Sequence, residues 1–225
     1  DVYKRQIPDY NVLKNKNLRE IALIIARREK LSFKELSLEV NVPPSTLQYR
    51  LHRLVNKSIL EKLSRGRYTL AYKTPLGFLS SKTPKAYLGL LGLRQEHKEP
   101  EWVTALNLLE KEGFRINEVT IVATPEAVSS WSNHVTTRVN WRLCSSDDLF
   151  KPSKCIEILE PIIADIARKS ALIVDITAGP RPAGVMLHKI ASRYYVPQIY
   201  VREDTKKLYW IVSLKEILRN MGIIS

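Results

Sequence analysis

The sequence has little of what builds a cross-linked, secreted or membrane-spanning protein. Its 225 residues include two cysteines, Cys144 and Cys155, which match neither a zinc-ligand spacing nor a C-x-x-C redox pair. No apolar run approaches the roughly 20 residues that a membrane-spanning helix requires, and no secretory signal is recognised. We therefore expect reduced thiols, no membrane partner and a cytoplasmic location.

Motifs for common cofactors and catalytic centres are also missing. The sequence holds neither a GxGxxG fingerprint nor a P-loop lysine motif, which makes NAD and ATP poor candidates. Asp147 and Asp148 stand in a polar loop, where turn chemistry explains them at least as well as a metal. No i,i+4 pair and no nearby cysteine ligand accompanies the four histidines, which are His52, His97, His134 and His188. We expect no cofactor, no bound metal and no catalytic residue.

Positive charge, by contrast, is abundant and unevenly distributed. The chain has a net charge of +13; residues 1–75 contribute +9, from 16 Lys/Arg against 7 Asp/Glu, and residues 76–225 contribute +4, from 20 against 16. Such a concentration suggests a polyanionic partner for the N-terminal part, although a solvated basic surface would give the same balance.

The N-terminal part shows helical spacing interrupted by turn signals. Apolar positions predict a helix over 17–30, and the S-x-x-E pattern of Ser32–Glu35 is a capping box that starts a short second helix. Ser45 is expected to cap a third helix. Strand-like runs at 59–63 and 67–72 predict a hairpin with a basic tip.

This order of elements resembles a winged helix-turn-helix domain, which we place at residues 12–74. The resemblance implies that the third helix enters the major groove of double-stranded DNA and that the hairpin tip contacts phosphate or the minor groove. Winged helices also dock proteins, so a protein partner is the alternative. The polar and basic side chains expected to face DNA are Ser45, Thr46, Gln48, Tyr49, Arg50, Arg53, Arg65 and Arg67.

A linker over 75–85 leads to a second domain over 86–225, in which strands and helices alternate. That alternation predicts an α/β fold with a mostly parallel, Rossmann-like sheet. Ligands of such sheets bind outside the carboxyl ends of the strands. Expected strands are 86–93, 118–125, 139–145, 171–177, 197–203 and 207–213, and expected helices are 100–113, 126–135, 153–170, 182–195 and 214–222.

The loop "DITAGPRP" (175–182) carries more chemistry than a turn requires. Its glycine and the following helix start can offer N–H groups to an anion, and Thr177 and Arg181 add a hydroxyl and a bidentate cation. Two prolines stiffen the loop. The alternative is an ordinary turn in which Asp175 and Thr177 cap the helix and Arg181 is solvated; Asp175 is expected to organise the loop rather than act as a base.

The D-x-T-x-G-x-R loop, together with the opening strand "YLGLLGL", resembles CRISPR-associated Rossmann-fold (CARF) domains. Archaeal CRISPR regulators that join a CARF domain to a winged helix are similar, although there the CARF domain usually comes first and the loop often has paired glycines. The resemblance implies a homodimer that binds a cyclic oligoadenylate, most often cyclic tetra-adenylate, between two symmetric loops. The implied ligand-binding residues are Arg94, Gln95, Thr124, Thr177, Ala178, Gly179, Pro180 and Arg181.

The sequence therefore favours a DNA-binding transcriptional regulator of a CRISPR-type system that is controlled by a cyclic oligonucleotide. Two alternatives stay open: a ring nuclease, in which Arg181 and Thr177 would stabilise the transition state, and a regulator that senses another anionic metabolite.

Overall fold

The computed structural model describes residues 6–94, 99–131 and 139–224, which divide into two compact units. The first unit comprises the chain up to Thr83, together with Ala167–Ala171 and the C-terminal segment from Leu214. The second comprises Pro84–Ile166 and Leu172–Ser213. The expected linker thus contributes a short 3-10 helix, η3 (Leu76–Leu79), to the first unit. The division passes through one long helix and the strand that follows it.

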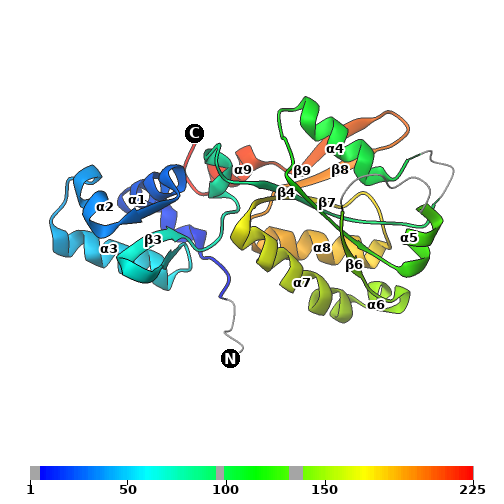
Figure 1. The fold of residues 1–225 in the computed structure, drawn as a ribbon, viewed down its shortest axis with the longest axis horizontal. Coiled ribbons are helices and arrows are strands. Elements are labelled where there is room, and N and C mark those ends of the chain that lie inside the picture. Colours follow the sequence, from blue (N-terminus) through cyan, green and yellow to red (C-terminus); the bar gives the residue numbers. More distant parts are fainter. Residues whose placement is uncertain (1–5, 95–98, 132–138, 225) are drawn as a thin grey trace. The chain divides into compact units, whose positions relative to one another are not determined.

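The first unit combines helices with a small antiparallel sheet (Figure 1). Its strands are β1 (Lys30–Ser32), β2 (Leu60–Lys62) and β3 (Arg67–Leu70), in the order β1-β3-β2. β2 and β3 form the expected hairpin, joined through the turn η2 (Ser64–Gly66), whereas β1 is an addition to the sequence prediction. The helices are η1 (Tyr10–Lys14), α1 (Lys16–Arg28), α2 (Phe33–Glu39), α3 (Pro44–Asn56) and α9 (Leu214–Asn220).

Local capping explains where these helices begin. The predicted capping box of α2 is confirmed, because Glu35 N–H donates to Ser32 Oγ at 3.2 Å and Ser32 N–H donates to Glu35 Oε2 at 2.7 Å. The expectation for α3 was wrong: Pro43 occupies the cap position, and Ser45 makes no capping hydrogen bond. Pro44 starts the helix two residues earlier than expected, since a first-turn residue needs no N–H and the proline ring presets the helical φ.

The second unit is an α/β domain built on a six-stranded sheet in the order β6-β5-β4-β7-β8-β9. The pairs β4–β5, β5–β6 and β7–β8 run parallel, and β9 runs antiparallel to β8. This mostly parallel sheet fits the predicted Rossmann-like arrangement. The strands are β4 (Lys85–Leu90), β5 (Glu118–Ala123), β6 (Asn140–Leu143), β7 (Ala171–Asp175), β8 (Gln198–Arg202) and β9 (Lys207–Val212).

Helices cover both faces of this sheet, with α4 on one face and α7 and α8 on the other (Figure 1). β7 is buried at every position, as a central strand covered on both faces should be. Pro161 lies inside the continuous helix α7. The helices are α4 (Glu101–Lys111), α5 (Pro125–Trp131), α6 (Ser146–Phe150), α7 (Pro152–Lys169) and α8 (Arg181–Arg193). Within the described residues, no helix is long and apolar enough to cross a membrane.

Candidate functional site

The loops singled out by the sequence meet at one hollow beyond the carboxyl ends of β4, β5 and β7. This hollow has a volume of about 530 Å³ and is lined by residues that follow each strand: Leu91–Leu93 after β4, Thr124 after β5, and Thr177–Pro180 after β7. Because β4 and β7 end at Leu90 and Asp175, earlier than predicted, the residues beyond them are free to form its floor. We call this hollow the sheet-end pocket.

Asp175 anchors the loop between β7 and α8. Its side chain is only 3% exposed and accepts hydrogen bonds from the Tyr87 hydroxyl at 2.5 Å, from Thr177 N–H at 2.8 Å and from the Thr177 hydroxyl. The Thr177 hydroxyl in turn accepts from Val201 N–H at 2.8 Å, which ties the loop to β8. Its one proton is used by Asp175, so Thr177 positions the loop and has no proton to give a phosphate.

Burial sets the ionisation of this pair. Desolvation raises the pKa of Asp175 to about 6, against the opposing effect of the hydrogen bonds from Thr177 and Tyr87. Burial, together with the neighbouring Asp175 charge, also holds the pKa of Tyr87 well above its usual value. At neutral pH the arrangement is therefore a carboxylate that accepts a hydrogen bond from a neutral phenol.

Gly179 lets the loop pass close to β4. It has a φ of +86°, and a Cβ at this position would lie 2.8 Å from Leu90 Cβ, so both the backbone conformation and the space require glycine. A Cβ on Gly92 would lie 3.6 Å from Gly179 N, which shows that the two loops run side by side. The floor of the sheet-end pocket is consequently backbone without bulky side chains.

Backbone donors are open at this floor. The N–H groups of Ala178 and Gly179 donate to no other residue that the structure describes, and Pro180 occupies the cap position of α8 without a side-chain hydrogen bond. Two such N–H groups beside the start of a 13-residue helix form a suitable environment for an anion. Thr124, in contrast, is engaged: its hydroxyl accepts from Ala127 N–H at 3.2 Å at the start of α5.

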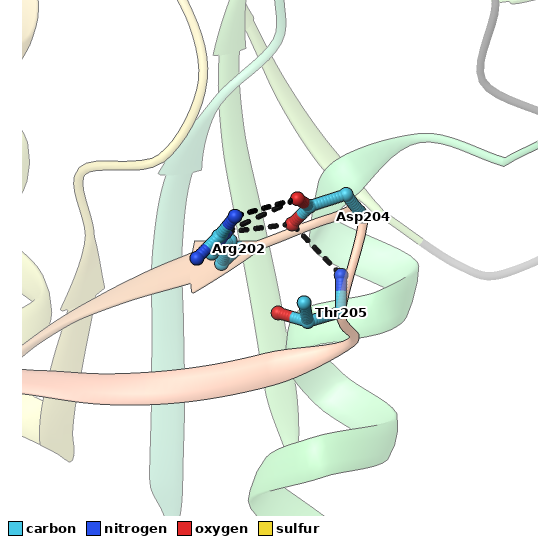
Figure 2. A network of polar contacts seen from close by, with 3 residues as sticks. All are labelled: Arg202, Asp204 and Thr205. Atoms are coloured by element: carbon cyan, nitrogen blue, oxygen red, sulfur yellow. Dashed lines mark hydrogen bonds and ion pairs between the residues drawn. The ribbon is translucent and has the colours of Figure 1, made fainter.

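The nearby cations lie around the pocket rather than in its lining. Arg94 and Arg181 directly follow lining residues, are exposed and have no ion pair with any described residue; the Arg94 guanidinium lies 5.5 Å from the Trp131 ring centroid. Arg202, at the end of β8, is instead held by Asp204, with Nε to Oδ1 and Nη2 to Oδ2 both 2.9 Å; Thr205 N–H also donates to Asp204 (Figure 2). Of these three arginines, Arg94 and Arg181 are the ones without an ion pair among the described residues.

Carboxylates form part of the lining itself, from Glu101, Glu126 and Glu203. Glu203 Oε2 accepts from Lys206 Nζ at 2.6 Å and from Thr104 Oγ1 at 3.3 Å. The backbone N–H of Glu126 and the Thr124 side chain lower the pKa of Glu126. The pocket therefore offers hydrogen-bond acceptors beside the open N–H donors of the loop, a combination suited to a ligand with phosphate oxygens as well as hydroxyl or amino groups.

The predicted ligand-binding residues fall into three groups. Thr124, Thr177, Ala178, Gly179 and Pro180 line the pocket; Arg94 and Arg181 flank it; Gln95 lies outside the described residues. Sequence reasoning missed lining residues from other elements. Glu203 directly follows β8, so the same strand-end rule could have predicted it. Tyr200 lies in the middle of β8, and α6 is five residues long and gave no periodic signal. The missed side chains include Glu101, Glu126, Phe150, Tyr200 and Glu203.

In the first unit, the predicted DNA-facing side chains lie on the outer surface of α3 and on the hairpin. Leu47, Leu51 and Leu54 are buried, so the opposite side of α3 faces solvent. A hollow of about 450 Å³ lies beside this surface toward β2 and β3, and another of about 240 Å³ lies beside it toward the start of α1. All eight predicted residues are exposed or partly exposed: Ser45, Thr46, Gln48, Tyr49, Arg50, Arg53, Arg65 and Arg67.

None of the four arginines forms an ion pair among the described residues, although the charge of Arg67 acts on the Glu35 carboxylate. Arg53 lies 5.9 Å from the centroid of the exposed Tyr49 ring. Arg65 has a φ of +61° at the hairpin tip, an unusual conformation for a residue with a side chain. The described part of the chain contains no group of three or more His, Cys, Asp or Glu side chains able to hold a metal ion.

No protein-family model and no curated protein matches the sequence. Among solved structures, Can2 from Sulfobacillus thermosulfidooxidans in complex with cyclic tetra-adenylate aligns over 56% of this chain at 15% identity, with a TM-score of 0.39. VC1899 from Vibrio cholerae aligns over 57% of this chain at 11% identity, with a TM-score of 0.41. Enterococcus italicus Csm6 bound to cyclic hexa-2′-fluoro-hexa-dAMP aligns over 64% of this chain at 9% identity, with a TM-score of 0.41. This chain spans 34%, 33% and 41% of those chains, respectively.

Proposed function

We propose that the chain is a cytoplasmic, DNA-binding transcriptional regulator of a CRISPR-type system, controlled by a cyclic oligoadenylate. The observation that carries this proposal is the sheet-end pocket, in which the backbone of the "DITAGPRP" loop, Gly92 and Thr124 lie together at the carboxyl edge of a mostly parallel sheet. This edge is where such sheets hold their ligands. A larger hollow of about 660 Å³ lies near the start of β5 and β6, and contains none of the predicted residues.

The chemistry of the pocket suits a nucleotide. The free N–H groups of Ala178 and Gly179 and the guanidinium of Arg181 are donors for phosphate oxygens, and Arg94 adds a second cation. The carboxylates of Glu126 and Glu203 are acceptors for ribose hydroxyls or an adenine amino group. A simple inorganic anion would use the first set and be repelled by the second. The pocket thus favours a ligand that carries both kinds of group.

A cyclic ligand with two-fold symmetry requires two copies of this pocket. Each copy of the loop reads half of the ring, so the proposed complex is a homodimer with one ring between two chains. Cyclic tetra-adenylate is the ring we propose, with two adenylates for each chain.

The first unit supplies the proposed DNA contact. We interpret α2, α3 and the β2–β3 hairpin as a winged helix-turn-helix in which α3 enters the major groove. The support for this is the exposed or partly exposed arginines of α3 and the hairpin, which form no ion pair among the described residues, together with the +9 charge of residues 1–75. Base edges would be contacted from α3, and phosphates from Arg65 and Arg67 of the hairpin.

The proposal is tested by incubating the full chain with labelled cyclic tetra-adenylate and measuring both retention and integrity of the ring. We expect the intact ring to be retained, and Arg181→Ala to weaken its binding at least tenfold, since one charge-assisted phosphate contact is lost. Arg193→Ala is the matched control, because Arg193 lies at the other end of α8 and pairs with Glu160 at 3.3 Å. Neither substitution should alter DNA affinity without ligand.

Each other outcome points to a different function. Linear products would assign a ring nuclease. Failure to retain the ring while a competing anionic metabolite protects the chain from unfolding would assign a metabolite sensor. Loss of DNA binding in Arg181→Ala, equal to its loss of ring binding, would show that the two units had been assigned wrongly.

A further inference from the structure

Exposed apolar side chains gather around the sheet-end pocket. Leu93, Phe150 and Tyr200 all line it and are 62%, 59% and 40% exposed, respectively. A single exposed apolar residue needs no explanation, but several at the mouth of one hollow indicate a surface that something covers. None of the three was part of the sequence-based site.

Two of these side chains are aromatic and come from elements far apart in the sequence. Phe150 is the last residue of α6, a helix that packs against α8, and Tyr200 lies in the middle of β8. Between them the pocket floor is the backbone of Gly92 and Gly179. The pocket therefore joins a stretch of glycine backbone with hydrogen-bond donors to a mouth that carries two aromatic rings.

We propose that Phe150 and Tyr200 are nucleobase-stacking residues of this pocket, so that adenine rings pack on them while the phosphates lie on the loop backbone. This inference rests on the proposed function and assigns the part of the ligand that the phosphate contacts leave unexplained. A flat purine offers a π-face that an aromatic side chain contacts without needing any one hydrogen-bond pattern. The carboxylates in the same lining accept hydrogen bonds from an amino group at the edge of such a ring.

The experiment measures the affinity of the full chain for cyclic tetra-adenylate in which one adenine is replaced by fluorescent 2-aminopurine. Phe150→Ala and Tyr200→Ala are each expected to weaken binding about tenfold and to raise the fluorescence of the bound probe, because a stacked base is quenched. Tyr200→Phe keeps the ring and is expected to bind within about twofold of the unsubstituted chain. The slope of affinity against salt stays unchanged in all three, since phosphate contacts are untouched.

Tyr209→Ala is the matched control. Tyr209 pairs directly with Tyr200 across the β8–β9 ladder and is 39% exposed, yet it does not line the pocket. We expect this variant to bind the probe as the unsubstituted chain does, which separates stacking from a general effect of removing a surface tyrosine.

Three results would overturn the inference, and they are distinguishable. If the unsubstituted chain binds no ring, the proposed function fails as well. If it binds the ring and Phe150→Ala and Tyr200→Ala bind equally tightly, stacking alone is wrong. Sedimentation measures how much of each variant is still a dimer. If the loss of ring affinity in both variants only follows the loss of dimer, the aromatic mouth is covered by a second copy of the chain instead of by bases.

Discussion

Asp175 shows how one buried residue sets the shape of the candidate site. A carboxylate that is 3% exposed pays a desolvation penalty, which the hydrogen bonds from Tyr87 and Thr177 offset only in part. The sequence predicted that Asp175 organises the loop, and its contacts agree with that role. Because burying the charged form of Asp175 lowers folding stability, the free energy of unfolding should depend on pH.

The pH dependence follows from the sign of the pKa change. The pKa of Asp175 is raised from 3.8 to about 6 in the folded chain, so the folded state binds more protons than the unfolded state between these values. The stabilising effect of protonation is complete below pH 3.8 and is lost as the pH rises through 6. Between pH 7.5 and pH 5, the free energy of unfolding should increase by about 1.4 kcal/mol on account of this group, the value of one pKa unit.

The measurement compares the unsubstituted chain with Asp175→Asn in urea at both pH values. An asparagine keeps an oxygen for Thr177 N–H and places an amide opposite Tyr87, but does not titrate. All four tryptophans, at positions 102, 131, 141 and 210, belong to the second unit, so tryptophan fluorescence follows its unfolding. Between pH 7.5 and pH 5 the unsubstituted chain should gain about 1.4 kcal/mol of unfolding free energy relative to Asp175→Asn. A difference between the two proteins that is constant with pH would contradict the raised pKa.

The same loop shows what the sequence could predict about single residues. The need for Gly179 and the loop's place at a strand end followed from local rules that involve neighbours in the chain. The commitment of the Thr177 hydroxyl to Asp175 and Val201 did not, because Val201 is 24 residues away and its N–H is left for Thr177 only by the pairing of β7 with β8. Roles that depend on long-range partners need the fold.

At the scale of elements, α3 and the β2–β3 hairpin carry separate parts of the proposed DNA contact. In the proposed complex the helix would offer side chains to base edges, whereas the hairpin tip would reach phosphates. We expect Arg50→Ala to weaken binding to the target promoter about tenfold, with a smaller effect on unrelated DNA. Arg65→Ala should weaken binding to all sequences alike and lower the slope of log affinity against log salt by about 1.

Fluorescence anisotropy over a salt series measures both quantities. Arg28→Ala is the control, because Arg28 lies in the same unit and pairs with Glu39 at 3.2 Å, away from the α3 surface. If Arg50→Ala and Arg65→Ala both bind DNA as tightly as the unsubstituted chain, the surface of α3 is a protein-docking surface, the alternative that the sequence left open.

Elements also differ in how far the sequence determines them. Helices and strands of ordinary length were predicted because their apolar residues repeat with a recognisable period. β1 has three residues and α6 has five, too few for any period to show, and both form because longer elements are available to pair or pack with them. For this reason the sequence did not predict the position of Phe150, which forms one side of the pocket mouth.

At the scale of the whole molecule, the sequence indicated two parts but not how the chain distributes between them. The shift from helix and hairpin patterns to alternating strands and helices led us to expect a linker over 75–85, and the second unit begins at Pro84. No sequence pattern predicted that α9 and residues 167–171 join the first unit, because an amphipathic helix has the same periodicity whichever core it joins. In the first unit, Thr74 Oγ1 donates to Ser170 O at 2.8 Å, and both Lys73 and Thr74 N–H donate to Ala167 O.

β7 therefore begins with Ala171, which belongs to the first unit, and ends at Asp175, where the loop that lines the sheet-end pocket begins. The proposed control of DNA binding by the ring requires a link between the two binding events. The link has a strict consequence: if the ring changes DNA affinity by some factor, DNA must change ring affinity by the same factor. For a coupling of about 1 to 3 kcal/mol this factor is roughly 5 to 150.

We expect the two factors, measured independently, to agree. DNA affinity is determined with and without saturating cyclic tetra-adenylate, and ring affinity with and without saturating promoter DNA, on the same full-length chain and at one salt concentration. Arg181→Ala should lower the affinity for the ring, and Arg50→Ala should lower the affinity for DNA. Both variants should keep the same coupling factor between the two ligands, because neither residue belongs to β7, the strand that runs from the first unit into the second. A factor of one in both directions would mean that the units bind their ligands independently, and control of transcription by the ring would then be ruled out even if both binding events were real.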